Sequence, residues 1–176
     1  MVALGSLHDV LEAVEDERVE LGFLPIENAI EGSVRDTLDS LLFDRELLIQ
    51  REVVLDIHLH LMARPGTGIE EVRRVMSIPM ATAQCRAFLV DRLPAAEVAP
   101  ANSTADAARL LGEGGADVLD VPTAAIAPRL AAKLYGLDIL AEDVDEYPEN
   151  QTFVGAVARH GIPAPTGHDR TTIACC

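Results

Sequence analysis

The feature that most constrains this chain is a regular alternation of short apolar runs and helical patterns between residues 72 and 141. The runs VRRVMS, EVAPA, DVLDVP and LDILA have the length of buried strands. The helical segments predicted between them cover residues 79–93, 103–113 and 123–135. Strands that alternate with helices in this way predict parallel strands with helices on both faces of the sheet. The chain is therefore expected to have an α/β fold.

The flanking sequence adds elements of both kinds. Apolar residues recur at helical spacing in 6–16 and 33–43, and strand-like runs cover 20–26, 47–63 and 152–158. The run 20–26 contains Pro25, which is predicted to close that strand. Residues 160–172 are rich in proline and glycine and predict a linker.

Charge and composition exclude several classes of partner. The 176 residues carry a formal net charge of −15, which argues against nucleic acid and anionic membrane as partners. Aromatic residues make up only 3%, so base-stacking surfaces are not expected. No apolar run approaches the roughly 18 residues that span a bilayer, and the first residues lack the basic flank of a signal peptide. The expected location is the cytoplasm.

The cysteines and histidines predict no metal site. Cys85 lies in an apolar pattern and is predicted to be a buried free thiol, whereas Cys175 and Cys176 lack metal-ligand spacing. His58 and His60 could begin a two-ligand site, but no third ligand follows at suitable spacing. We favour structural roles for both histidines.

Hydroxyl side chains mark the predicted starts of three helices, at Ser33, at Ser103 with Thr104, and at Thr123. Helix N-termini bind carboxylate or phosphate because their first N–H groups are unpaired and the helix dipole is positive there. Plain capping is the favoured alternative, since the spacings Ser33–Asp36 and Ser103–Asp106 both fit a capping box. Both interpretations stay open on these residues alone.

The loop after Pro25 is unusually polar for the end of an apolar run. Glu27, Asn28 and Glu31 could offer carboxylates and an amide to a polar substrate, or they could form a solvated loop. These patterns alone lead to a two-lobed α/β protein with a candidate site for a small anion.

Five motifs, in one order along the chain, resemble the prephenate dehydratase family. GFLPIENAIEGSV resembles the family's Pro-Ile-Glu-Asn…Glu-Gly-Ser-Val signature, and VRRVMSIPMATAQCRAFL its Ser-His-Pro-Gln-Ala…Ala-Gln-Cys segment. ANSTADAARLL resembles its Asn-Ser-Thr-Ala helix entry, and AAIAPRLAAKLYGLDIL the helix-to-strand pattern that follows. DEYPENQTFV occupies the place of its Asn-x-Thr-Arg-Phe motif. The resemblance covers nearly the whole chain.

The resemblance implies a fold like a type II periplasmic binding protein, with two α/β lobes, mainly parallel sheets and a site in the cleft between the lobes. The first lobe is expected at residues 1–76 plus about 145–164, and the second at 77–144. Residues 165–176 are expected to be a linker and the start of a regulatory ACT domain. In the family, a strand and a Gly-Pro-Glu-Gly-Thr-Phe loop also precede the part that matches this chain.

The resemblance further implies that prephenate is converted to phenylpyruvate, water and carbon dioxide in phenylalanine biosynthesis. No cofactor is expected, prephenate is the expected partner, and the protein is expected to be a homo-oligomer. The implied catalytic residues are Thr152, Ser77 and Gln84, and the implied substrate-binding residues are Glu27, Asn28, Ser33, Asn102, Ser103 and Thr104. Thr152 matches the family threonine that assists departure of the ring hydroxyl.

Two departures from the family motifs weaken the expected activity. No arginine stands between Thr152 and Phe153, and such an arginine would be the natural partner of a substrate carboxylate. Ile78 replaces the histidine of Ser-His-Pro. Two alternatives therefore stay open: a prephenate decarboxylase that does not aromatise the ring, and a non-catalytic prephenate-binding or remnant protein.

Overall fold

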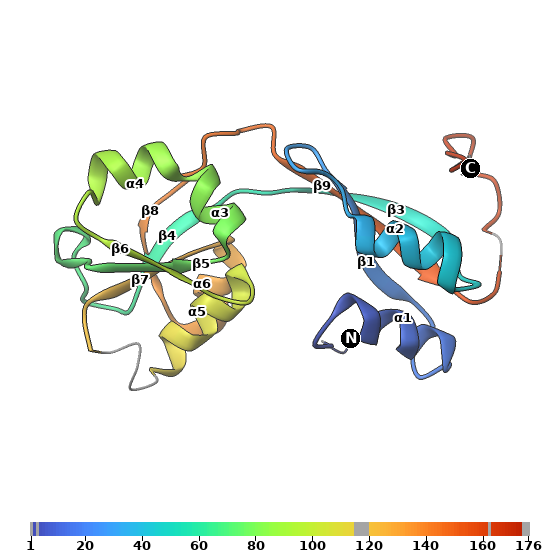
Figure 1. The fold of residues 1–176 in the computed structure, drawn as a ribbon, viewed down its shortest axis with the longest axis horizontal. Coiled ribbons are helices and arrows are strands. Elements are labelled where there is room, and N and C mark those ends of the chain that lie inside the picture. The colour runs from blue at the N-terminus through green and yellow to red at the C-terminus, as the bar shows by residue number, and fades with distance from the viewer. Residues whose placement is uncertain (1, 3, 115–119, 162, 174–176) are drawn as a thin grey trace. The chain divides into compact units, whose positions relative to one another are not determined.

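The computed structural model describes residues 2, 4–114, 120–161 and 163–173 (Figure 1). Contacts within the chain divide it into two units, Met1–Asp56 with Asn150–Cys176 and Ile57–Glu149. Each unit contains one sheet and its own buried core. The α/β class is confirmed.

The first unit is built on a four-stranded sheet of order β2-β1-β9-β3. Its elements are α1 (Leu7–Glu15), β1 (Gly22–Asn28), β2 (Gly32–Ser33), α2 (Arg35–Asp39), the π-helical turn η1 (Ser40–Asp44), β3 (Leu48–Asp56) and β9 (Gln151–Ala158). All three strand pairs of this sheet are antiparallel, so the expectation of mainly parallel sheets is wrong here. The reason is that β9 runs against both of its neighbours, while β1 and β2 form a short hairpin.

Helix α1 covers one face of this sheet. The Ser6 side chain caps the helix by accepting a hydrogen bond from the Asp9 N–H at 3.1 Å. Leu11 and Val14 pack against Leu24 of β1 and Val157 of β9 in a buried cluster. The helix predicted at 6–16 is thus confirmed, together with the face it buries.

Strand β1 does not end at Pro25, contrary to the prediction. It continues to Asn28, and its pairing with β9 shifts by one residue between Pro25 and Glu27. The extra residue, Ile26, forms a β-bulge beside a proline that has no N–H to offer a ladder. Pairing resumes after the bulge, and this brings Asn28 opposite Thr152.

Ser33 does not cap a helix, so the capping box predicted at Ser33 and Asp36 is wrong. Ser33 lies in β2, where it pairs with Glu27. The residue before α2 is Val34, and no side chain caps that helix. The strand pairing of Ser33 takes precedence over the local capping pattern.

The second unit is built on a five-stranded mixed sheet of order β6-β5-β7-β4-β8. Its elements are β4 (His60–Ala63), the 3₁₀ turn η2 (Ile69–Glu71), β5 (Arg74–Ser77), α3 (Pro79–Gln84), α4 (Arg86–Arg92), β6 (Glu97–Pro100), α5 (Thr104–Glu113), β7 (Thr123–Ala127), α6 (Arg129–Tyr135) and β8 (Asp138–Ala141). β5 is parallel to β6 and β7, whereas β4 is antiparallel to β7 and β8. The parallel prediction therefore holds for part of this sheet.

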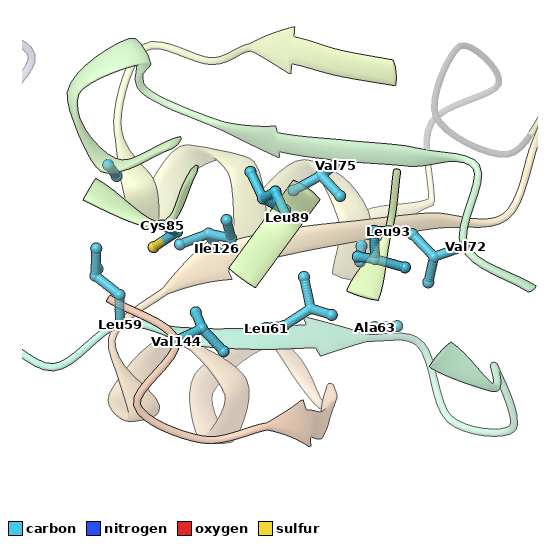
Figure 2. Close-up of a cluster of buried hydrophobic side chains, with 12 residues drawn as sticks. Leu59, Leu61, Ala63, Val72, Val75, Cys85, Leu89, Leu93, Ile126 and Val144 are labelled. Atoms are coloured by element: carbon cyan, nitrogen blue, oxygen red, sulfur yellow. The ribbon is translucent and has the colours of Figure 1, made fainter. Parts of the chain in front are cut away.

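Two buried clusters lie on opposite faces of the second sheet, because alternate residues of a strand point to opposite sides. Leu61, Val75 and Ile126 pack with α3 and α4 on one face (Figure 2). Met62 and Met76 pack with α5 and α6 on the other face. Helices on both faces are thus confirmed for this unit (Figure 1).

The helix predicted at 123–135 is wrong over its first half. Thr123–Ala127 is β7, a central strand with all five residues buried, and α6 begins only after Pro128. Alanine favours helices by propensity, but small side chains also suit a strand packed on both faces. Of the strand predicted at DVLDVP, residues 117–119 lie outside the described residues, and 120–122 form no strand.

The boundaries between the units differ from those expected. Contacts place them at 56/57 and 149/150 rather than 76/77 and about 144/145. The cause is β4, which pairs with β7 and β8 and so belongs to the second sheet. Residues 163–173 form no helix or strand, and their assignment as the start of an ACT domain stays a prediction.

Candidate functional site

A cluster of amide and hydroxyl side chains lies where β1 and β9 meet in the first unit. The Asn28 Nδ2 donates to Asn150 Oδ1 at 2.8 Å, Thr152 Oγ1 at 3.0 Å and the Gln151 carbonyl at 3.2 Å. Asn28 Oδ1 accepts from the N–H groups of Ile30 at 3.0 Å and Glu31 at 3.1 Å. Asn150 is only 2% exposed, while Asn28 and Thr152 are half-buried. We call Asn28, Asn150 and Thr152 the amide–hydroxyl cluster.

The loop after β1 is fixed by backbone bonds at both ends. The Ala29 N–H donates to the Gln151 carbonyl at 2.8 Å, and the Val34 N–H to the Ile26 carbonyl at 2.8 Å. These bonds hold Asn28 opposite Thr152, so the structure brings together two residues that lie more than a hundred positions apart in the sequence.

Glu27 and Ser33 form a separate exposed pair. They face each other across β1 and β2. Adjacent residues of a strand point to opposite faces, so Glu27 and Ser33 lie on the face opposite Asn28 and Thr152. The structure thus divides the four predicted residues of this unit into two pairs.

In the second unit, Ser77 and the residues before α5 lie together at one edge of the sheet. Ser77 ends β5 and is fully buried; its Oγ donates to the Ile126 carbonyl at 2.7 Å. Its own carbonyl accepts from the Ala101 N–H at 2.9 Å, which ties it to the turn 101–103. This edge holds the carboxyl ends of the parallel strands β5 and β6, where ligands bind in parallel α/β sheets.

The Asn102–Thr104 turn starts α5 as predicted. The Ser103 Oγ accepts from the Asp106 N–H at 2.9 Å, so the capping interpretation of Ser103 is confirmed. Asn102 is exposed, and its Nδ2 donates to Asp106 Oδ2 at 3.3 Å. The turn offers polar groups at the N-terminus of a ten-residue helix.

Gln84 is positioned by an acidic residue that sequence reasoning missed. Gln84 ends α3, is 5% exposed, and its carbonyl accepts from the Glu146 N–H at 2.8 Å. The Glu146 carboxylate accepts from the Ala87 N–H in the first turn of α4 at 2.7 Å. No local capping motif precedes α4, because its capping group comes from a segment about 60 residues later in the chain. The only sequence signal for the role of Glu146 is the lack of a local capping residue before α4.

The buried positions of His60 and Cys85 agree with the structural roles predicted for these two side chains. His60 is 3% exposed, and its Nδ1 accepts from the Asp143 N–H at 3.0 Å. Burial, with the Arg129 charge, lowers the pKa of His60. Burial, with Asp145 and Glu146, raises the pKa of the Cys85 thiol to about 12, so it is a neutral core residue. Among the described residues, no group of three histidine, cysteine or acidic side chains could hold a metal.

These features define an α/β protein with polar side chains gathered at strand ends in each of two units. The sequence profile described as prephenate dehydratase matches residues 1–160, and the chain belongs to that family. The resemblance of its motifs is thereby confirmed.

Individual relatives agree with the family assignment. A prephenate dehydratase of Mycolicibacterium vanbaalenii is 42% identical over 173 residues, which cover 98% of this chain and 54% of the relative. One of Mycobacterium tuberculosis is 40% identical over 163 residues, covering 92% of this chain and 49% of the relative. The chain thus spans about half the length of the curated relatives it matches.

Solved structures share the fold. A prephenate dehydratase from Arthrobacter aurescens, solved in complex with L-Phe, superposes with a TM-score of 0.84 and 36% identity, over 94% of this chain and 54% of that one. GqqA, described as a novel type of quorum quenching acylase, superposes with a TM-score of 0.76 and 30% identity, over 92% of this chain and 56% of that one. The α/β fold expected from the resemblance is thus shared with a solved prephenate dehydratase. The individual site residues stay predictions.

Proposed function

We propose that this chain carries the catalytic residues of a prephenate dehydratase, which converts prephenate to phenylpyruvate, water and carbon dioxide for phenylalanine synthesis. One observation carries the proposal. In a chain of this family, the threonine that matches the family motif is held by Asn28 at 3.0 Å, at a half-buried position. A fixed hydroxyl that substrate can reach is what assistance to a leaving group requires.

The reaction needs little chemistry from the protein. The bond between the ring and its carboxylate breaks, carbon dioxide leaves, and the electron pair enters the ring. The ring carbon–hydroxyl bond breaks, and the departing hydroxyl takes up a proton and leaves as water. Aromatisation drives both cleavages, so the protein mainly orients the dianion and supplies a hydrogen bond to the hydroxyl. We assign that hydrogen bond to Thr152.

Of the remaining predicted residues, those before α5 are proposed to bind a substrate carboxylate. Asn102, Ser103 and Thr104 lie at the N-terminus of α5, where backbone N–H groups and the helix dipole favour an anion. Because Ser77 donates its proton to the Ile126 carbonyl, it can act on a ligand only as an acceptor. The substrate-binding roles of Glu27 and Ser33, and the catalytic role of Gln84, are proposed from the family resemblance.

The proposal extends to surroundings and partners. A cytoplasmic location and a homo-oligomer are inferred from the biosynthetic role and from family membership. No helix in the part of the chain that the structure describes is long and apolar enough to cross a membrane. The net charge of −15 supports a small-molecule partner over nucleic acid or an anionic membrane.

The test is product analysis with purified protein and prephenate at neutral pH, with an enzyme-free control for spontaneous decay. The proposal is supported if phenylpyruvate and carbon dioxide form together and if the Thr152→Val variant forms neither. Carbon dioxide without an aromatic product indicates the non-aromatising decarboxylase. Saturable prephenate binding in calorimetry without any product indicates a non-catalytic binding protein.

A further inference from the structure

We propose that Asn28 is a positioning residue that sets the direction of the Thr152 hydroxyl, and that it does not itself bind substrate. The proposal rests on the proposed function for its catalytic meaning. The orientation that we assign to the Asn28 and Thr152 side chains rests only on hydrogen bonds within the first unit. It revises the role that the family resemblance implied for Asn28.

The orientation of the Asn28 amide follows from its backbone partners. An asparagine amide is assigned from its hydrogen-bond network. Backbone N–H groups only donate, and those of Ile30 at 3.0 Å and Glu31 at 3.1 Å both point to one end of the Asn28 amide. That end must be the oxygen, so the nitrogen faces β9.

The hydrogen-bonding capacity of Asn28 is fully used by the protein. An asparagine side chain has two N–H donors and an oxygen with two acceptor sites. The oxygen sites are occupied by Ile30 and Glu31. The two N–H groups serve Asn150 Oδ1 at 2.8 Å and Thr152 Oγ1 at 3.0 Å, with the Gln151 carbonyl at a longer 3.2 Å. A substrate that contacted Asn28 would have to displace one of these bonds.

The donation from Asn28 fixes which way Thr152 can donate. A threonine hydroxyl has one proton, and its oxygen here accepts from the Asn28 N–H. In the described ranges, 2, 4–114, 120–161 and 163–173, the Thr152 hydroxyl finds no acceptor for its own proton. Thr152 is half-buried, and we assign this proton to a bound ligand. The leaving hydroxyl of prephenate is the acceptor that the proposed reaction supplies.

Asn150 is the buried hydrogen-bond partner that fixes the Asn28 amide. It is 2% exposed, and its Oδ1 accepts from Asn28 at 2.8 Å, the shortest contact in the amide–hydroxyl cluster. This bond occupies one Asn28 N–H and leaves the other for Thr152. The amide of Asn28 is therefore held between a backbone turn on one side and two side chains on the other.

The first experiment needs no turnover. In ¹⁵N-labelled protein, the Asn28→Asp variant identifies the Asn28 side-chain N–H signals by their loss. We expect both Asn28 side-chain protons to exchange slowly with water. We also expect Thr152→Val to change the chemical shift of one of these protons far more than that of the other. The exposed Asn102 side chain is the internal reference. The proposal is overturned if the Asn28 side-chain protons exchange with water as fast as those of Asn102. It is also overturned if their chemical shifts do not change in Thr152→Val.

The second experiment separates positioning from binding by kinetics. Asn28→Asp keeps an oxygen for the Ile30 and Glu31 N–H groups but, when ionised, has no proton to donate. The Thr152 hydroxyl then turns inward to donate to the carboxylate, and kcat should fall at least about tenfold (~1.4 kcal/mol) with KM little changed. A rise in KM at unchanged kcat would instead mark Asn28 as a binding residue and refute the proposal.

The same variant carries a pH signature that a merely structural role would lack. A protonated carboxyl has one O–H and can donate to Thr152, so kcat of Asn28→Asp should recover as pH falls, relative to the unmodified protein. The carboxylates of Glu27, Glu31 and Asp56 favour the protonated form of the introduced carboxyl, whereas the Ile30 and Glu31 N–H groups favour the ionised form, so the titration of kcat itself gives the pH of recovery. Asn28→Ala, which has no donor at any pH, should show no recovery.

Two controls complete the design. Gln50→Glu adds the same charge near the start of β3, away from Thr152, and removes one donation to the Gly161 carbonyl. It should show neither the kcat loss nor the recovery. If the unmodified protein does not turn prephenate over, the proposed function fails while the proton-exchange measurement still decides the role of Asn28. Recovery of Asn28→Ala at low pH would refute the inference without touching the proposed function.

Discussion

At the scale of single residues, the buried His60 links pH to stability. Its Nδ1 is the acceptor for the Asp143 N–H, so the fold requires that nitrogen to be unprotonated. Burial and the Arg129 charge lower the pKa of His60 from its ordinary value of 6.5, and the carboxylates of Asp143 and Glu142 only partly oppose this. The unfolded chain therefore binds a proton more readily than the folded protein just below pH 6.5.

We predict that this histidine costs stability as pH falls. The contribution of neutral His60 to the free energy of unfolding is fully present above about pH 6.5, the pKa of histidine in the unfolded chain. It is lost as pH falls through the lower pKa of His60 in the folded protein. The melting temperature should drop over that window in the unmodified protein. His60→Asn, which keeps an acceptor but does not titrate there, should flatten the drop.

The matched control is His58→Asn, because His58 is exposed and lies two residues away. That variant should keep most of the pH dependence of the unmodified protein, because His58 is the smallest of the causes that act on the pKa of His60. If His58→Asn removes the dependence and His60→Asn does not, the assignment to His60 is incorrect.

At the scale of elements, β9 is one residue short of both strands that flank it. The pairing of β1 with β9 has one extra residue at Ile26, and the pairing of β3 with β9 has one extra residue at Gln50. Both bulges lie on the same side of Thr152, toward the end of β9. A single residue missing from β9 just after Thr152 accounts for both. This agrees with the absence of the family arginine between Thr152 and Phe153.

We predict that one residue inserted between Thr152 and Phe153 removes both bulges. The new residue would pair with Glu27 and Val54, and the far ends of the strands would keep their present partners. An alanine insertion should leave the melting temperature unchanged or raise it. An arginine insertion should in addition strengthen prephenate turnover about ten- to a hundredfold, since a charge-assisted hydrogen bond contributes ~1.5–3 kcal/mol.

The two insertions separate register from charge. Equal gains in turnover from alanine and arginine would assign the effect to register alone. Loss of folding in the alanine insertion would show that the bulges are required rather than tolerated. The gain from arginine should also disappear when Thr152→Val is combined with it.

Several elements show what the sequence could and could not predict. The α5 cap at Ser103 is local, so its spacing alone predicted it, and the α1 cap at Ser6 has the same local form. β7 was predicted as helix because the helix propensity of alanine takes no account of burial on both faces of a sheet. Pro128, directly before α6, was the local signal for the true start of that helix. The amide–hydroxyl cluster depends on a bulge in β1, and the cap of α4 on a distant acid. Neither leaves a local pattern.

At the scale of the whole molecule, the two units differ in how the chain builds them. The second unit is one continuous stretch, Ile57–Glu149, with a buried cluster on each face of its sheet. The first unit needs two stretches, because β9 from the end of the chain lies between β1 and β3. A continuous unit with its own core is the kind that folds alone.

We therefore predict that a fragment of residues 57–149 folds independently, with a single cooperative melt and dispersed NMR signals. Ile126→Ala in the fragment should lower its free energy of unfolding by about 2–5 kcal/mol, because Ile126 is fully buried in the cluster of Figure 2. A fragment of residues 1–56 lacks β9, so β1 and β3 have no strand between them and should remain unfolded. If 57–149 gives no cooperative transition while 1–56 does, stability resides in the first unit, and the division of the molecule argued from its contacts is wrong.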